Sequence, residues 1–119
     1  MKTELIKQLT GNFESAARLA DDVEFWYARD LQDLLGYTKW ENFLQVVEKG
    51  KTACTNSGQE VEDHFAGVGK MVDIGSGTQR EIPDMMLTRY ACYLIAQNGD
   101  SRKDQIAFAM SYFAVQTRK

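Results

Sequence analysis

Residues 70–82, which read KMVDIGSGTQREI, decide the class of this fold. Val72 and Ile74 alternate with their neighbours and share one face, a period of two that is typical of a strand. The residues Gly75, Ser76 and Gly77 form a turn sequence, and residues 78–82 are expected to form the second, antiparallel strand. The stretch therefore predicts one β-hairpin with a loop of about three residues. Pro83 is expected to end the second strand.

Helical periodicity precedes this hairpin. The apolar pattern predicts a first helix that begins near Leu5 and either breaks or kinks at Gly11, where Asn12 could act as a new N-cap. Thr38 and Glu41 form a T-x-x-E capping box, which predicts that another helix starts there. The remaining expected elements on this side are a short strand at residues 23–28, a helix at 29–35 ended by Gly36, and one turn at 60–64.

Two more helices are expected after the hairpin. Asp84 is a plausible N-cap for the first, which should end at the Asn98-Gly99 pair. Ser101 and Asp104 resemble a second capping box, before a broadly apolar helix over about residues 102–117. The chain is therefore predicted to be α+β and mostly helical, with four to five helices and one hairpin.

Length and charge limit the function classes. The 119 residues suit one domain over residues 1–119, and the uncapped last helix suggests the N-terminal piece of a longer protein. The net charge is −3, which is unfavourable for a strong DNA binder. Residues 1–63 carry 12 acids and 7 bases (−5), whereas residues 64–119 carry 5 acids and 7 bases (+2). A nucleic-acid face is therefore expected from the second half or from selected bases of the first.

The residue types needed for catalysis or metal binding are sparse. The chain has one histidine, His64, and its two cysteines, Cys54 and Cys92, lie far apart rather than in a C-x-x-C pair. No pattern brings a thiol, an imidazole and a carboxylate together. We expect no catalytic residues, no metal, no cofactor and no enzymatic activity. The absence of a signal peptide or membrane span indicates a cytoplasmic protein with free thiols.

Residues 28–50 outline a helix-turn-helix pair, with Gly36 and Tyr37 in the turn. The second helix would expose Lys39, Asn42 and Lys49, side chains that can contact bases or phosphates. Two packed helices joined by a glycine turn are also common in helical proteins, and Glu41 and Glu48 would repel phosphates.

The other candidate contacts lie in the second half. Lys70 and Arg80 flank the hairpin tip, and such hairpins touch DNA in some folds. Arg89, Arg102 and Lys103 complete the candidate set. Each of these side chains could also be an ordinary solvated charge.

Several short segments together resemble a known family. The strongest is residues 87–100, LTRYACYLIAQNGD, and the others are 27–31 (YARDL), 34–37 (LLGY), 40–43 (WENF), 61–65 (VEDHF), 70–72 (KMV), 74–77 (IGSG), 80–82 (REI), 102–103 (RK) and 106–109 (IAFA). From about Phe13 onward, the chain resembles the start of the DNA-damage-inducible protein D family, which is similar to the N-terminal domain of Bro-type viral proteins and phage antirepressors. The resemblance implies bacterial damage-response (SOS) regulation, DNA or nucleoprotein binding, no enzymatic activity, and a further C-terminal region.

Two residues depart from a standard helix-turn-helix. With Gly36 in the turn, the standard motif requires a small residue at position 32 and an apolar residue at position 42, where this chain has Gln32 and Asn42. We therefore expect a non-standard geometry. Ser101 also stands where many antirepressor-like domains have proline.

The sequence leaves two hypotheses. The first is a non-enzymatic regulatory domain that binds DNA or a nucleoprotein complex. The second is a protein-interaction module that acts on a repair or recombination protein, such as a recombinase filament, and the −5 first half suits it better. Neither hypothesis involves a membrane, and the oligomeric state stays open, a homo-oligomer included.

Overall fold

The computed structural model describes residues 1–115, which form six helices and a four-stranded antiparallel sheet. In chain order the elements are α1 (Thr3–Ala16), β1 (Arg18–Ala20), β2 (Val23–Tyr27), α2 (Ala28–Leu34), α3 (Trp40–Asn56), α4 (Val61–His64), β3 (Phe65–Asp73), β4 (Gln79–Thr88), α5 (Arg89–Gln97) and α6 (Asp104–Ala114). The α+β class is confirmed, but residues 1–115 form six helices rather than the four to five predicted, and their sheet has four strands rather than the two of a single hairpin. The sequence predicted that the last helix extends to about residue 117, and positions 116 and 117 lie outside the described residues.

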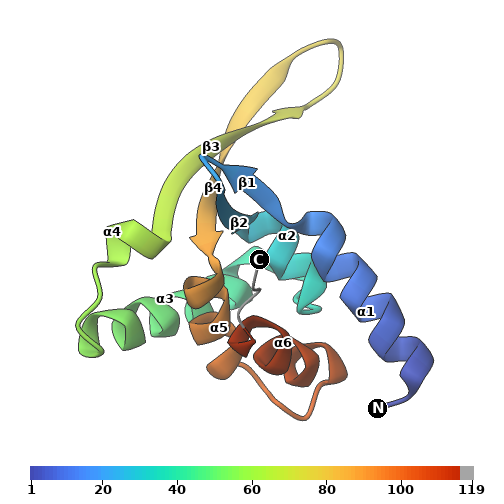
Figure 1. The fold of residues 1–119 in the computed structure, drawn as a ribbon. Coiled ribbons are helices and arrows are strands. Elements are labelled where there is room, and N and C mark those ends of the chain that lie inside the picture. The colour runs from blue at the N-terminus through green and yellow to red at the C-terminus, as the bar shows by residue number, and fades with distance from the viewer. Residues whose placement is uncertain (116–119) are drawn as a thin grey trace.

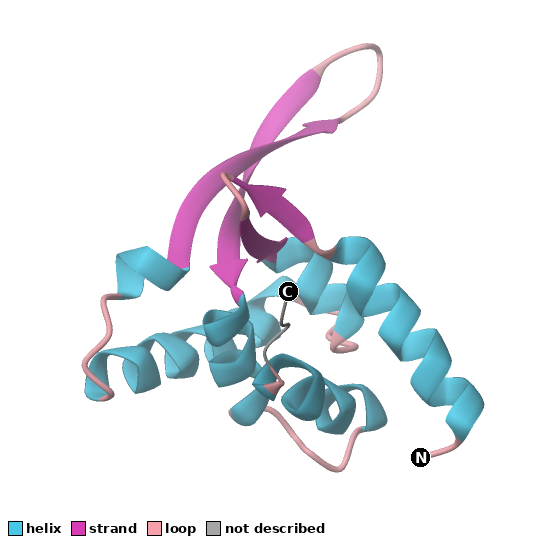
Figure 2. Ribbon diagram, viewed as in Figure 1, coloured by secondary structure: helices cyan, strands magenta, loops and turns pink. Residues whose placement is uncertain are grey.

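The sheet has the strand order β1-β2-β4-β3, and its last two strands extend beyond the others. The helices gather around one end of the sheet, and the β3–β4 hairpin rises away from them (Figure 1). The outer half of this hairpin has no helix beside it (Figure 2). The hairpin is therefore an arm that a partner can reach from several directions.

Trp26 lies at the centre of the core that anchors this arm. Its side chain is fully buried, and its indole N–H donates to the carbonyl of Phe13 at 3.0 Å. Its ring meets that of Phe113 edge-on, with centroids 4.9 Å apart. Trp26 pairs with Leu87 across the sheet, and Leu87 pairs with Phe65, so the three share the inner face. Burying side chains of this size contributes about 2–3 kcal/mol each, which holds α1, α6 and the base of the hairpin together.

The hairpin is longer than predicted, and Pro83 does not end its second strand. β4 continues through Pro83 to Thr88. The Pro83 carbonyl accepts a hydrogen bond from Arg29 Nε at 3.0 Å, so it points away from β3. Because the N and C=O of a strand residue point to the same side, the missing N–H of Pro83 also faces away from β3. No bond of the β3–β4 ladder is lost.

Asp84 is not the N-cap of the following helix, which was the prediction. It lies within β4, and α5 begins only at Arg89. Thr88 caps α5 instead, since its side chain accepts from the N–H of Ala91 at 3.2 Å. The reason is strand pairing: β2 and β3 both pair with the end of β4, which keeps residues 84–88 extended.

Two other predicted helix starts were placed too early. Thr38 and Ser101 were expected to cap their helices, but the N-cap positions are Lys39 and Lys103, and neither has a side-chain cap hydrogen bond. The first backbone bond of α3 runs from Phe43 N to Lys39 O at 3.1 Å. Solvent can satisfy the open N–H groups of such exposed first turns, so a capping side chain is dispensable there.

The first expected helix is shorter than its pattern and has no break. α1 runs through Gly11 and ends at Ala16, and the residues after it form the strand β1. Asp21 and Asp22 both have positive φ, as a type I′ turn requires, and this turn pairs β1 with β2. The strand was missed because aspartates fill turn positions that glycine or asparagine usually marks.

Within residues 1–115, no helix combines the length and apolar character that crossing a membrane would require.

Candidate nucleic-acid interface

The register of the hairpin brings Lys70 and Arg80 to the same face. Val72 pairs with Arg80, and Lys70 pairs with Ile82. Because side chains two apart in a strand point to the same side, these four residues share one face of the ribbon. Ile74 continues this register, since its N–H donates to the carbonyl of Thr78 at 3.0 Å. We call Lys70, Val72, Ile74, Arg80 and Ile82 the basic face.

The opposite face carries the hairpin's exposed acids. Met71, Asp73, Gln79 and Glu81 alternate with the residues of the basic face. Asp73 accepts a hydrogen bond from the Gln79 amide at 3.1 Å, and the Glu81 carboxyl lies where a side chain at Gly69 would otherwise project. We call these four residues the acidic face. The arm therefore has opposite charges on its two sides, and an anion is attracted to only one of them.

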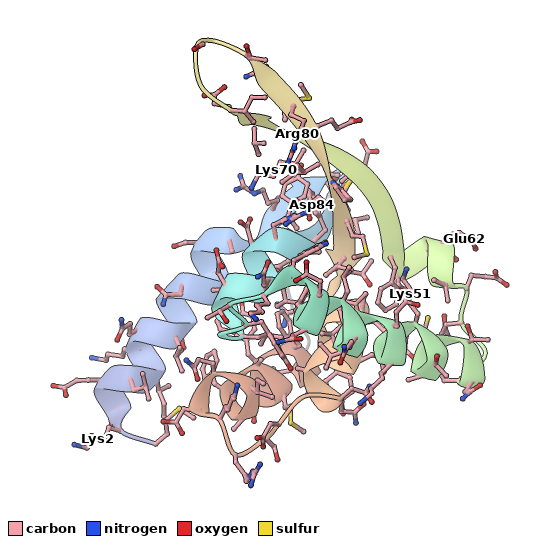
Figure 3. The ribbon with its side chains drawn as sticks, turned by 180° about the vertical axis from the view of Figure 1, so that it is seen from behind. Lys2, Lys51, Glu62, Lys70, Arg80 and Asp84 are labelled. Carbon is pink, nitrogen blue, oxygen red and sulfur yellow. The ribbon has the colours of Figure 1, made fainter. Side chains whose placement is uncertain are left out.

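Lys70 and Arg80 are available for an external anion. Both are exposed, and no carboxylate among residues 1–115 forms an ion pair with either. Both lie on the part of the hairpin that stands above α2 (Figure 3). Two exposed cations close together on a protruding ribbon can contact neighbouring phosphates.

A hollow of about 330 Å³ continues the basic face toward the body. It is lined by Arg18, Tyr27, Asp30, Gly69, Lys70 and Asp84. Arg18 Nη2 lies 3.8 Å from Asp30 Oδ2, and its guanidinium lies 5.6 Å from the centroid of the Tyr27 ring. The Asp84 carboxylate accepts from the backbone N–H groups of Arg29 and Met85 at 3.0 and 2.8 Å. Arg18 thus adds a third cation, which sequence reasoning missed because β1 was unexpected.

The pair α2 and α3, which the sequence predicted as a helix-turn-helix, is joined by a tightly closed turn. Gly36 has φ +83°, its N–H donates to Asp33 O, and the N–H of Tyr37 donates to Gln32 O, which ends α2 as predicted. Gln32 is buried, and its amide donates to Tyr37 O at 3.1 Å. The Arg29 guanidinium lies 3.7 Å from the centroid of the Trp40 ring, which joins α2 to α3. Gln32 therefore takes part in the turn itself, at a position where a standard motif needs a small residue.

The candidate residues near and on α3 lie on a surface of mixed charge. Lys39, Asn42 and Lys49 are all exposed. Glu41 and Glu48 are exposed as well, and Lys51 Nζ lies 3.3 Å from Glu48 Oε2. Phosphates approaching this surface would meet both signs of charge, so it attracts anions less strongly than the basic face does.

Arg89 is engaged inside the protein. Its Nε and Nη2 atoms contact the Glu24 carboxylate at 2.9 and 3.3 Å, and its Nη1 donates to the carbonyl of Tyr112 at 2.8 Å. The guanidinium also lies 5.2 Å from the centroid of the Trp26 ring. Burial opposes the charge, but the hydrogen bond and the charge of Glu24 outweigh it and raise the pKa of Arg89. Arg89 therefore joins β2, α5 and α6.

Arg102 and Lys103 lie together before α6, but both have neighbours on the protein. Arg102 forms two side-chain contacts of 3.0 Å with Asp100. These hydrogen bonds, and the bond from the Arg102 backbone, lower the pKa of Asp100 to about 2. The Lys103 ammonium lies 5.7 Å from the centroid of the Tyr37 ring. Asp100 offsets part of the positive charge at this corner.

The groups that could have supplied chemistry lie in structural positions. Cys54 and Cys92 are buried, and burial raises the pKa of both thiols. His64 Nδ1 lies 2.6 Å from the hydroxyl of Thr88, and its ring meets that of Tyr90 at 4.9 Å. Among residues 1–115, no three His, Cys, Asp or Glu side chains are grouped so that they could hold a metal ion.

Two comparisons with known proteins match most of the described chain. Residues 16–115 match the model of the BRO family, N-terminal domain. The chain is 48% identical over 100 residues to DNA damage-inducible protein D of Escherichia coli strain K12. This alignment covers 84% of the chain but only 36% of that relative, so the chain spans little more than a third of its length. No solved structure matches.

Proposed function

Because this chain belongs to the BRO family, N-terminal domain, and is similar to a DNA damage-inducible protein, we propose that it is a non-enzymatic, DNA-binding regulatory domain of the bacterial damage (SOS) response. It acts in the cytoplasm and binds duplex DNA through the basic face of its hairpin, with Arg18 at the base of that face. The observation that carries the proposal is the pairing register of β3 and β4, which places Lys70 and Arg80 on one side of a protruding arm.

Charge separation supports this surface over the others. The basic face holds two cations without an ion-pair partner among the described residues, whereas Glu41 and Glu48 lie beside the α3 candidates. Arg89 has Glu24, and Arg102 has Asp100. The acids of the hairpin, Asp73 and Glu81, lie on its other side. Asp84 does lie on the basic face, but its carboxylate is buried and accepts two backbone N–H groups, and the nearby Asp30 pairs with Arg18. The exposed outer part of this face therefore presents Lys70 and Arg80 to phosphates.

The strength of binding should be modest. Each phosphate neutralised by a lysine or arginine contributes about 0.9 to the slope of log K against log salt for duplex DNA. Three contacts, from Lys70, Arg80 and Arg18, give a slope of about −3. Dissociation constants of about 10⁻⁴–10⁻⁶ M at physiological salt are usual for sequence-independent binding of this kind. The net charge of −3 favours the weak end of that range.

The decisive experiment is a salt titration of binding to a labelled duplex, with the double variant Lys70→Ala/Arg80→Ala. We expect the magnitude of the slope of log K against log salt to decrease by about 2, because two phosphate contacts are lost. Lys2→Ala/Lys7→Ala is the matched control, since it removes the same charge from the N-cap and first turns of α1, and Lys2 lies far from the hairpin (Figure 3). An unchanged slope in the hairpin variant, or an equal loss in the control, contradicts the proposed face.

Two further double variants test the other candidate surfaces. Lys39→Ala/Lys49→Ala reports on α3, where a loss of binding would favour the helix-turn-helix mode. Arg102→Ala/Lys103→Ala reports on the loop before α6. A chain that binds neither duplex nor single-stranded DNA at low salt would refute DNA binding. It would favour the protein-interaction module, for which a recombinase filament on single-stranded DNA is the partner to try.

A further inference from the structure

The end of the hairpin carries an exposed apolar side chain on the basic face. Ile74 is 55% exposed, and it lies at the last paired position before the turn. Single exposed apolar side chains are common on protein surfaces, so exposure alone assigns Ile74 no role, and its place at the end of the basic face is what distinguishes it. The residues beyond it are small: Gly75, Ser76 and Gly77, each with positive φ. Ile74 is therefore the largest side chain that the tip offers to a partner on that face.

We propose that Ile74 is a wedge that enters between stacked base pairs from the minor groove and kinks the duplex. This inference rests on the proposed function, because Lys70 and Arg80 must first hold the DNA backbone. Isoleucine is among the side chains that minor-groove proteins insert between base steps, where they partly unstack the bases and bend the helix. The ligand class is thus narrowed to duplex DNA that can be bent.

The spacing along the ribbon suits this mode. At a rise of about 3.3 Å per residue, Ile74 lies about 7 Å along β3 from the level of Arg80 and about 13 Å from Lys70. These intervals correspond to about two and four base-pair steps of 3.4 Å. The flexible stems of Lys70 and Arg80 can therefore reach phosphates that flank the step entered by Ile74.

The turn holds Ile74 in place. The N–H of Ile74 donates to Thr78 O at 3.0 Å, and the N–H of Thr78 donates to Gly75 O at 2.9 Å. The turn residues have little or no side chain, so the tip is narrow. The minor groove of B-DNA is only about 6 Å wide, and bulky residues beside the wedge would obstruct its approach.

The hairpin provides its own matched control. Met71 is 56% exposed, almost the same as Ile74, but it lies on the acidic face. Truncating Ile74 or Met71 to alanine removes a similar exposed apolar side chain from the same arm. Neither residue is part of the core, so both variants should fold normally.

The test uses the whole 119-residue chain and a duplex that contains 2-aminopurine, whose fluorescence rises when the base unstacks. End-to-end energy transfer on the same duplex reports bending. We expect the natural chain to raise the 2-aminopurine signal and shorten the end-to-end distance. Ile74→Ala should abolish most of both changes while keeping the salt slope, with affinity changed by less than about tenfold. Met71→Ala should behave like the natural chain.

The outcomes separate the two proposals. Salt-dependent binding that is weakened by Lys70→Ala/Arg80→Ala, without unstacking by the natural chain, overturns the wedge and leaves the proposed function standing. Equal loss of unstacking in Ile74→Ala and Met71→Ala also overturns it. An absence of any binding to DNA removes both proposals together.

Discussion

The carboxylate of Asp84 accepts a hydrogen bond at 3.0 Å from the backbone N–H of Arg29, 55 positions earlier in the chain. Arg29 lies in the first turn of α2, where backbone N–H groups have no partner within the helix. Asp84 therefore does cap a helix, but one that is distant in sequence. The bond ties the start of α2 to the strand that supports the hairpin.

Replacing Asp84 with alanine should destabilise the fold by about 1–3 kcal/mol, because the N–H groups of Arg29 and Met85 lose their acceptor. Urea unfolding would show a lower midpoint with an unchanged m value. Asp73→Ala is the control, since Asp73 is exposed and its carboxylate, within residues 1–115, bonds only the Gln79 side chain. A change within about 0.5 kcal/mol is expected for it. Equal effects of the two variants would contradict the cap.

Two helical glycines should respond to alanine in opposite directions. A Cβ at Gly11 meets nothing within 4 Å, so Gly11→Ala should stabilise α1 by about 0.5–1 kcal/mol through lower backbone entropy. A Cβ at Gly50 would lie 3.1 Å from Ile95 Cγ1 and 3.4 Å from Ile95 N. Because that backbone nitrogen is held in α5, Gly50→Ala should push α3 and α5 apart at a net cost of about 1 kcal/mol. Thermal melts of the two variants should therefore shift in opposite directions, and a stabilising Gly50→Ala would show that the helices can separate freely.

The pair Arg89–Glu24 should be important for stability, with side chains only 14% and 30% exposed. Arg89→Ala leaves Glu24 unpaired and removes packing against Trp26, so we expect a loss of about 2–3 kcal/mol. Arg18→Ala removes a longer and more exposed pair with Asp30, at 3.8 Å, and should cost less than about 1 kcal/mol. Chemical denaturation of both variants checks the ranking. The reverse order would show that Arg89 has little structural role.

Asp100 should titrate at unusually low pH. Its hydrogen bonds with Arg102 lower its pKa to about 2, whereas an aspartate in an unfolded chain has a pKa of about 3.9. A lowered pKa in the folded state means that the contribution to stability is present above pH 4 and is lost as the pH falls toward 2.

Carboxyl NMR titration measures this pKa directly. Arg102→Ala should return the midpoint toward the ordinary value, whereas Lys103→Ala should change it much less, because the Lys103 charge is a smaller contribution. A midpoint near 4 in the natural chain would show that the Arg102 contact does not persist in solution.

Local patterns were enough to predict several features. The alternation and glycine turn of residues 70–82 predicted the hairpin, and Gly36 was recognised as the end of α2. The single turn at residues 60–64 and the strand near residues 23–28 also follow from neighbouring residues. Each of these features depends on backbone conformations and hydrogen bonds that span only a few residues.

The sequence predicted the candidate site only in part. Lys70 and Arg80 were chosen because they flank the tip, but their shared face follows from a pairing register, which depends on the number of residues in the turn. Arg18 needed the unexpected β1–β2 turn to approach the hairpin. The sequence made Arg89 a candidate contact for nucleic acid, but in the structure its guanidinium pairs with Glu24, 65 positions away.

The sequence alone determined the α+β class and the β3–β4 hairpin, because periodicity and turn residues act over short distances, and the resemblance of its motifs pointed to the BRO family. The tertiary structure decided which cations have internal partners, which helix Asp84 caps, and that β4 continues through Pro83. Those outcomes depend on groups 54 to 65 positions away, and only the packing of the whole chain determines which of them meet.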